Sequence, residues 1–163
     1  MTTAAAVERE VLLELFAPGS PAPKGSTKGF VAQKRGRKAR AVLTADNPLT
    51  QKSWTEACSA ALDEAWRGLM PIPDPVHVHA DFVMPRRQTA PRWWTPPHTR
   101  KPDGDKLTRC TWDCLTGIVI VDDAQVVSWS GGKREAEPGE HGGAYVRVER
   151  LIYPGPPERA AAA

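Results

Sequence analysis

Short carboxylates are concentrated in one stretch of this chain, residues 101–127. The stretch holds five of the nine aspartates and none of the ten glutamates, although the chain carries a formal net charge of +3. The five are Asp103, Asp105, Asp113, Asp122 and Asp123. Anions held close together repel one another unless a cation lies among them, and Mg²⁺ prefers carboxylate, water and phosphate oxygens. The cluster therefore predicts a site for Mg²⁺, with Mn²⁺ as a substitute, in an enzyme that hydrolyses phosphodiesters.

The first part of the cluster opens a predicted helix at about residues 105–116. Asp103 and Asp105 flank a single glycine, close enough to bind one ion or bridge two. Asp105, Arg109 and Asp113 are spaced four residues apart and therefore share one face of that helix. The alternative is that the first two carboxylates only cap the helix.

The second part follows the apolar run "IVIV", residues 118–121, which is predicted to be a strand. Asp122 and Asp123 end this strand a short turn after the helix, so we expect carboxylates from two adjoining elements to converge. Adjacent residues of a strand point to opposite faces, and only one of the pair is therefore expected to reach the site. The pattern does not say which one. The alternative is a turn that has no part in chemistry.

Basic residues are distributed unevenly over the rest of the chain. The segment between Glu14 and Asp46 contains no acid, and its bases are Lys24, Lys28, Lys34, Arg35, Arg37, Lys38 and Arg40. The segment between Asp81 and Asp103 also lacks acids, and its bases are Arg86, Arg87, Arg92, Arg100 and Lys101. Two wholly basic segments, one leading directly into the aspartates, indicate a surface that binds a polyanion through its phosphates. The alternative is a pair of solvated surface loops.

The elements that position these residues can be predicted from hydrophobic periodicity and from turn residues. Strands are predicted at residues 9–16, 75–84, 124–130 and 144–153, and a long helix within residues 46–69. Loops are predicted at residues 17–43, 85–102 and 131–143, where proline and glycine recur. We expect one domain at residues 9–153, preceded by a disordered N-terminus at residues 1–8 and followed by a disordered tail at residues 154–163.

The loop at residues 85–102 contains five prolines and the adjacent Trp93 and Trp94. Indoles and arginines together suit a surface that binds unstacked bases and phosphates. The alternative is that both tryptophans fold back onto the core.

The composition of the chain argues against a membrane-spanning or secreted protein. No run approaches the ~20 apolar residues of a membrane span, and the acidic flank of the opening "MTTAAAVEREVLLELF" makes a poor signal peptide. We therefore expect a cytoplasmic protein. The three cysteines, Cys58, Cys110 and Cys114, are an odd number and lack metal-ligand spacing, which favours buried reduced thiols over a disulfide framework.

The stretch "KPDGDKLTRCTWDCLTGIVIVDDAQVV" resembles the signature of RusA-type Holliday junction resolvases. That signature is Asp-x-Asp opening a helix, a base six residues after the first Asp, a downstream helical Asp, and then Asp-Asp-x-Gln-Val. The earlier "PAPKGS" is similar to the Pro-x-Pro-Lys stretch of the same family. The resemblance covers residues 101–127 closely and residues 9–153 loosely. It implies a small α/β domain, with a mixed β-sheet and two main helices packed on it, that forms a homodimer and cuts four-way DNA junctions with Mg²⁺.

Carried over by position, the resemblance makes Asp103, Asp105 and Asp123 the catalytic metal ligands, with their neighbour Asp122 as a further and less critical metal-binding residue. Arg109 stands where the best-known members carry lysine, and we expect it to contact the scissile phosphate. Lys106 stands where asparagine is usual and adds a base beside the metal. The bases expected to bind DNA are Lys24, Lys28, Lys34, Arg35, Arg37, Lys38, Arg86, Arg87, Arg92, Lys101 and Lys106.

Two other classes of protein remain open from the residues alone. A nucleotide-sugar transferase also uses Asp-x-Asp and Mn²⁺, but it usually has a nucleotide-binding domain for which this chain is short. A non-catalytic, basic DNA-binding module would use the aspartates only for structure. Within nucleases, other branched DNA such as forks and flaps is a further possible substrate.

Overall fold

The computed structural model of the chain describes residues 7–25, 27–32, 40–45 and 48–155. Its elements in chain order are β1 (Glu8–Pro18), β2 (Thr27–Ala32), β3 (Arg40–Ala45), α1 (Pro48–Trp66), β4 (Val76–Met84), α2 (Gly104–Leu115), the short 3₁₀ helix η1 (Asp123–Gln125), β5 (Val126–Glu135) and β6 (Gly143–Ile152). The main sheet has the order β1-β6-β4-β5, and β2 and β3 form a separate two-stranded sheet.

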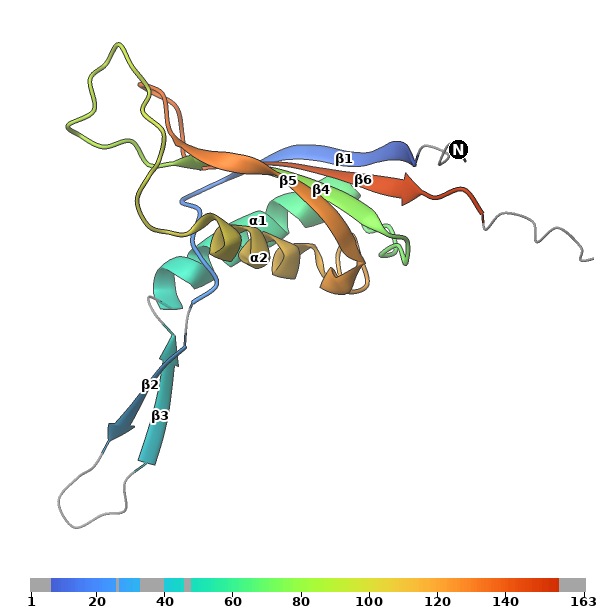
Figure 1. Cartoon of the computed structure of the whole chain (residues 1–163), viewed down its shortest axis with the longest axis horizontal. Coiled ribbons are helices and arrows are strands. Elements are labelled where there is room, and N and C mark those ends of the chain that lie inside the picture. The colour runs from blue at the N-terminus through green and yellow to red at the C-terminus, as the bar shows by residue number, and fades with distance from the viewer. Residues whose placement is uncertain (1–6, 26, 33–39, 46–47, 156–163) are drawn as a thin grey trace, which may run out of the picture.

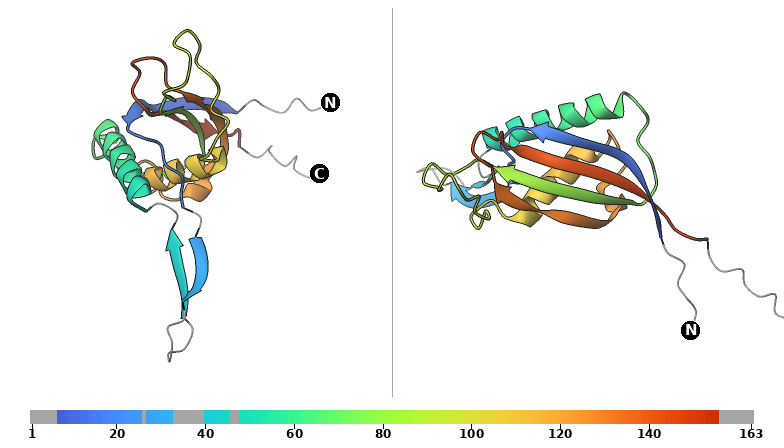
Figure 2. Two further views of the ribbon diagram at one scale, coloured as in Figure 1. Left: turned by 90° about the vertical axis from the view of Figure 1, so that its left-hand side faces the viewer. Right: turned by 90° about the horizontal axis from the view of Figure 1, so that it is seen from above.

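The main sheet is mixed, as expected. β6 pairs antiparallel with both β1 and β4, whereas β4 and β5 run parallel. Both helices cover the same face of this sheet (Figure 1 and Figure 2), which makes a single domain of two layers. The connection from β4 to the parallel β5 runs through α2, and the fold thereby carries the aspartate-rich stretch across the underside of the sheet.

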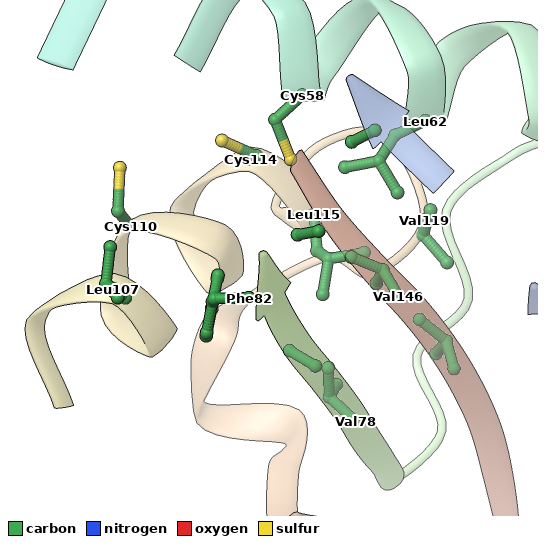
Figure 3. Packing of buried hydrophobic residues seen from close by; sticks show 14 of the residues in the cluster. Cys58, Leu62, Val78, Phe82, Leu107, Cys110, Cys114, Leu115, Val119 and Val146 are labelled. Carbon is green, nitrogen blue, oxygen red and sulfur yellow. The ribbon is translucent and has the colours of Figure 1, made fainter. Parts of the chain in front are cut away.

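Alternation along β4 explains why the helices pack on this face. Val78, Ala80 and Phe82 point toward the helices and are buried, as a period of two predicts. α1 presents Leu62 to them, and α2 presents Leu107, so that one apolar core lies between the layers (Figure 3).

The three cysteines lie in this core, as predicted, where α1 passes α2 (Figure 3). Cys58, Cys110 and Cys114 are all buried, and none of them forms a disulfide bond. Hydrogen bonding with Cys110 lowers the pKa of Cys114, but hydrogen bonding with Cys58 and burial outweigh it and raise that pKa to about 12. These thiols are therefore structural.

The opposite face of the main sheet is polar, because the alternate residues of β4 are His77, His79 and Asp81. The His77 ring bonds the hydroxyls of Ser128 and Ser130 at 2.8 and 2.9 Å. His79 lies 2.8 Å from the same Ser130 hydroxyl and 2.9 Å from an Asp81 carboxylate oxygen. Burial, and secondarily the charge of Arg9, lower the pKa of His77.

Three predictions of local structure are wrong. The presumed loop at residues 17–43 contains the β2–β3 hairpin, whose six residue pairs are antiparallel. Residues 118–121 do not form a strand, because the amides of Val119 and Ile120 turn back to donate to the Leu115 carbonyl at 2.9 and 3.3 Å. These two apolar side chains fill the core beyond the end of α2. Finally, β5 continues through Gly131 to Glu135, a stretch that was predicted to be a loop.

No helix in the described part of the chain is long and apolar enough to cross a membrane.

Candidate active site

Two of the predicted metal ligands, Asp103 and Asp105, lie at the start of α2. Asp103 occupies the N-cap position with extended backbone, yet its side chain makes no capping hydrogen bond. Its carboxylate is half exposed and lies 3.3 Å from the ammonium group of Lys106. Asp105 is exposed in the first turn. Capping therefore does not account for the Asp103 carboxylate, which is open to an ion on its solvent side.

Three predicted DNA-binding lysines line the same hollow as Asp103. Lys24, Lys101 and Lys106 line a hollow of about 390 Å³ together with this carboxylate. The segment after β1 is fixed there by the amide of Lys24, which donates to the Lys106 carbonyl at 3.1 Å. The Lys24 ammonium group lies 2.8 Å from a carboxylate oxygen of Asp113, the third of the five clustered aspartates along the chain. The "PAPK" stretch thus reaches the start of α2 although it lies some 80 residues earlier in the chain.

Asp105 and Arg109 face a second cavity, of about 600 Å³, between α2 and β5. They are one helical turn apart, as predicted from their spacing. The rings of Trp112 and Trp129 pack edge to face in the wall of this cavity, with their centroids 5.2 Å apart. Lys133 also lines it and donates to the carbonyls of Arg100 and Pro102, at 2.7 Å in each case. That amine therefore ties β5 to the segment immediately before Asp103.

Lys133 was missed by the sequence analysis. Trp129, Gly131 and Lys133 alternate along β5 and pair with the core-facing residues of β4, so all three face α2. The signal was present as a period of two, but the adjacent glycines suggested a loop. Gly131 has φ of +126°, and a Cβ there would meet the Ala80 carbonyl of the neighbouring strand. The glycine thus marks close approach of two strands.

The Asp-Asp-x-Gln stretch forms a small capping motif rather than a strand end. The Asp122 carboxylate accepts a hydrogen bond from the Ala124 amide at 2.8 Å, and the Gln125 side chain accepts one from the Asp122 amide at 2.8 Å. The Gln125 amide group also donates to the carbonyls of Ile72 and Asp74. Asp122 is therefore held in the cap of η1. The neighbouring Asp123 is exposed, and no hydrogen bond or ion pair engages its carboxylate within the described residues.

The structure does not bring Asp122 and Asp123 to Asp103 and Asp105 within one chain. The first pair follows the C-terminal end of α2 and the second opens its N-terminal end (Figure 1). A helix of this length, 12 residues, is about 18 Å long. Accordingly, no group of three or more His, Cys, Asp or Glu side chains in the described residues is placed to hold a metal ion.

Two of the predicted DNA-binding arginines in the loop at residues 85–102 are used internally. The Arg86 guanidinium donates to the carbonyls of Pro91, Trp94 and Ala136 at 2.6, 3.0 and 2.9 Å. Arg87 lies 2.6 Å from the carboxylate of Glu135, which is only 1% exposed.

The remaining members of that loop lie on the surface. Arg92 and Lys101 are exposed. Trp93 and Trp94 are 86% and 51% exposed, so they do not fold back onto the core.

The first basic segment is described only in part. Lys28 lies in β2, and the β2–β3 hairpin projects from the body on the side where α2 begins (Figure 1 and Figure 2). The other four predicted contacts, Lys34, Arg35, Arg37 and Lys38, lie outside the described residues.

Comparison with known proteins identifies a relationship over most of the chain. A family model described as "Endodeoxyribonuclease RusA" matches residues 18–149, which include the segment after β1, both helices and every aspartate of the cluster. A search of curated proteins finds no match.

Proposed function

The chain belongs to the RusA family of endodeoxyribonucleases, which are Holliday junction resolvases, and from this premise we propose that Asp103, Asp105 and Asp123 bind the metal ion with which it cuts DNA. Nucleases of this family are metal-dependent and act on branched DNA. We propose Mg²⁺ as the ion, with Mn²⁺ as a substitute, and residues 9–153 as the nuclease domain. Family membership sets aside both the sugar transferase and the non-catalytic module.

One observation carries the assignment of the first two ligands. Asp103 and Asp105 present exposed carboxylates on either side of one residue, and the first is free of the capping bond that its position would allow. Oxygen donors of this kind fit Mg²⁺, which keeps several waters and takes few protein ligands. When bound, the ion supplies a Lewis acid that activates water and offsets charge on the phosphodiester.

The bases near these carboxylates suit a phosphate-bearing substrate. Arg109, one turn after Asp105 and free of any ion pair within the described residues, is proposed to contact the scissile phosphate. Its planar guanidinium can bind two phosphate oxygens in a fixed bidentate geometry, which the ammonium group of lysine does not offer. Lys24, Lys101 and Lys106 are proposed to contact neighbouring phosphates and hold the backbone in register.

The third ligand requires a second copy of the chain. Because Asp123 follows the far end of α2, about 18 Å from the start of that helix, we infer that each metal site forms between two subunits. Asp103 and Asp105 would come from one subunit and Asp123 from the other. A two-fold dimer with antiparallel α2 helices brings the start of one helix beside the end of its partner. Exposed apolar side chains near η1, Val121, Val127 and Trp129, offer surface that such a partner would cover.

A cleavage assay tests this function. Purified protein is incubated with labelled four-way junction, fork and linear duplex in Mg²⁺, Mn²⁺, Ca²⁺ or EDTA. We expect paired cuts in the junction with Mg²⁺ or Mn²⁺, no cutting with EDTA, and binding without efficient cutting with Ca²⁺, which is larger and less demanding in geometry. Undiminished cutting after exhaustive chelation would contradict the assignment of a metal site.

A further inference from the structure

The loop at residues 85–102 displays two adjacent indoles that the proposed chemistry does not use. Trp93 is 86% exposed and Trp94 51% exposed, and neither makes a ring contact with another aromatic side chain within the described residues. Tryptophan is a large apolar side chain whose exposure to water is unfavourable. Two neighbouring indoles on the surface therefore indicate a binding surface.

The backbone beneath the indoles is held firmly in place. One guanidinium, that of Arg86, donates to three carbonyls, two of them within the loop at Pro91 and Trp94. The amide of Trp94 donates back to the Pro91 carbonyl at 3.3 Å, closing a turn under the indole pair. Farther along, Arg87 and Arg100 both approach the buried Glu135 carboxylate, at 2.6 and 3.4 Å. A surface ordered in advance loses less entropy on binding.

The charge around the indoles fits a polyanion. The chain contains no acid between Asp81 and Asp103. Arg92, immediately before the indoles, is exposed and lines a hollow of about 520 Å³ that also contains Arg86 and Arg87. Of these three arginines, Arg92 is the one without a hydrogen bond or ion pair within the described residues, so its guanidinium is available for a phosphate.

The loop also leads directly into the candidate active site. Trp94 and Asp103 are nine positions apart, so their backbones lie within about 30 Å of each other even for a fully extended chain. Lys133 holds the last part of the loop through the carbonyls of Arg100 and Pro102. A substrate that reaches the carboxylates at the start of α2 can therefore extend over the indoles.

We propose that Trp93 and Trp94 form a stacking platform for nucleobases that are unstacked at the branch point of DNA, with Arg92 on the adjoining phosphate. The inference rests on the proposed function and adds a means of selecting branched over linear DNA. Every base has an aromatic face, so stacking on indoles does not depend on sequence. In an intact duplex these faces are covered by neighbouring base pairs, and the platform gains nothing from it beyond the charge of Arg92.

The test measures affinity for a four-way junction and for a linear duplex of the same arm sequence, in EDTA and at fixed salt. The variants are Trp93→Ala, Trp94→Ala and the double replacement, with Trp93→Phe retaining an aromatic face. Tyr153→Ala is the matched control, because Tyr153 is also an aromatic residue, 53% exposed, and it follows β6 at the opposite end of the sheet. Each alanine variant should lose about five- to 150-fold in junction affinity, the range for loss of one stacked base.

Duplex affinity should remain unchanged in these variants, and Trp93→Phe should keep most of the junction affinity. A second readout places 2-aminopurine, a fluorescent base, at the branch point or in the middle of an arm. Stacking on indole should quench the branch-point probe with the wild-type chain and not with the double variant. If the double variant keeps the wild-type ratio of junction to duplex affinity, or quenches the probe equally, the platform is refuted.

Mg²⁺-dependent cutting by the wild-type chain in the same preparations would show that the proposed function stands regardless. A wild-type chain that neither binds nor cuts the junction would refute both.

Discussion

Mixed dimers of two inactive variants test whether the metal site is shared between subunits. The replacements are Asp105→Asn and Asp123→Asn, each of which keeps the shape of the side chain and removes its charge. Either homodimer should cut junctions slower than the wild-type chain by orders of magnitude, because both of its sites lack one metal ligand. The two positions lie near opposite ends of α2, a 12-residue helix of about 18 Å.

A site shared between subunits and a site within one chain predict different nicking activities for a mixture of the two variants. If each site combines Asp105 of one subunit with Asp123 of its partner, a mixed dimer has one site with both replacements and one fully intact site. Random pairing of equal amounts makes about half of the dimers mixed, and half of their sites are intact, so about a quarter of wild-type nicking should return. If all ligands came from one chain, each site of the mixed dimer would lack one ligand, and no activity would return.

The assay is strand nicking of a labelled four-way junction by co-expressed variants purified through two different affinity tags. Purified mixed dimers should nick at about half the wild-type rate and should leave the junction nicked once rather than resolved, since only one site works. The two homodimers serve as controls, and their thermal melting shows that each is folded. Mixed dimers that are as inactive as the homodimers would refute the shared site.

Three further outcomes are expected. Asp122→Asn should cut nearly as well as the wild-type chain, because asparagine can make the same capping bond. Asp122→Ala loses the bond to Ala124 and should lower the unfolding free energy by ~1 kcal/mol in urea titration; severe loss of cutting in a folded Asp122→Asn would show that the Asp122 charge is needed for catalysis. The pKa of His77 is lowered in the folded chain, so its neutral form stabilises the fold at pH values above the unfolded pKa of about 6.5. The unfolding free energy should therefore fall as pH drops through about 6.5 toward the lower folded pKa. His77→Gln should flatten this pH dependence, and an unchanged pH profile in that variant would contradict the role of His77. Alanine replacement of four bases that lie between β2 and β3 in the sequence should weaken binding to every DNA shape and reduce the salt slope by up to about 0.9 per contact, whereas an unchanged slope would mean that none touches phosphate. These four are Lys34, Arg35, Arg37 and Lys38.

The layers of the fold were predictable because their signals are local. Alternation identified β4, and a helical apolar period identified α1, so the buried faces of both were known before their partners. The pairing of residues 27–32 with residues 40–45 was missed because glycines and a dense run of bases obscured it, and the structure shows it as a register of six residue pairs. The run at residues 118–121 was read as a strand because four apolar residues alone do not distinguish a strand from a buried turn.

The candidate site was predictable in its residue types and not in its assembly. Spacing placed Asp105 and Arg109 on one helix face, and both do line one cavity. The expected convergence with Asp123 failed for a reason of geometry. Asp123 follows the C-terminal end of α2 in the sequence, so the length of the helix separates it from Asp103 and Asp105 at the N-terminal end. The alternation along β5 could have placed Lys133 on the side that faces α2, but no local pattern predicts the carbonyls before Asp103 to which it donates, because that contact depends on the tertiary path of the chain.

The separate β2–β3 sheet has a consequence for how this protein can diverge. Its strands pair with each other and not with the main sheet, and the chain enters it beside α1, where the Gly25 amide donates to the Gln51 side chain at 2.9 Å. The pairing of β2 with β3 therefore does not depend on the register of the main sheet. We expect the length and charge of the hairpin to differ between members of the family, while the main sheet and α2 vary less. Grafting hairpins between such chains would then be a route to retune DNA affinity without redesigning the catalytic body.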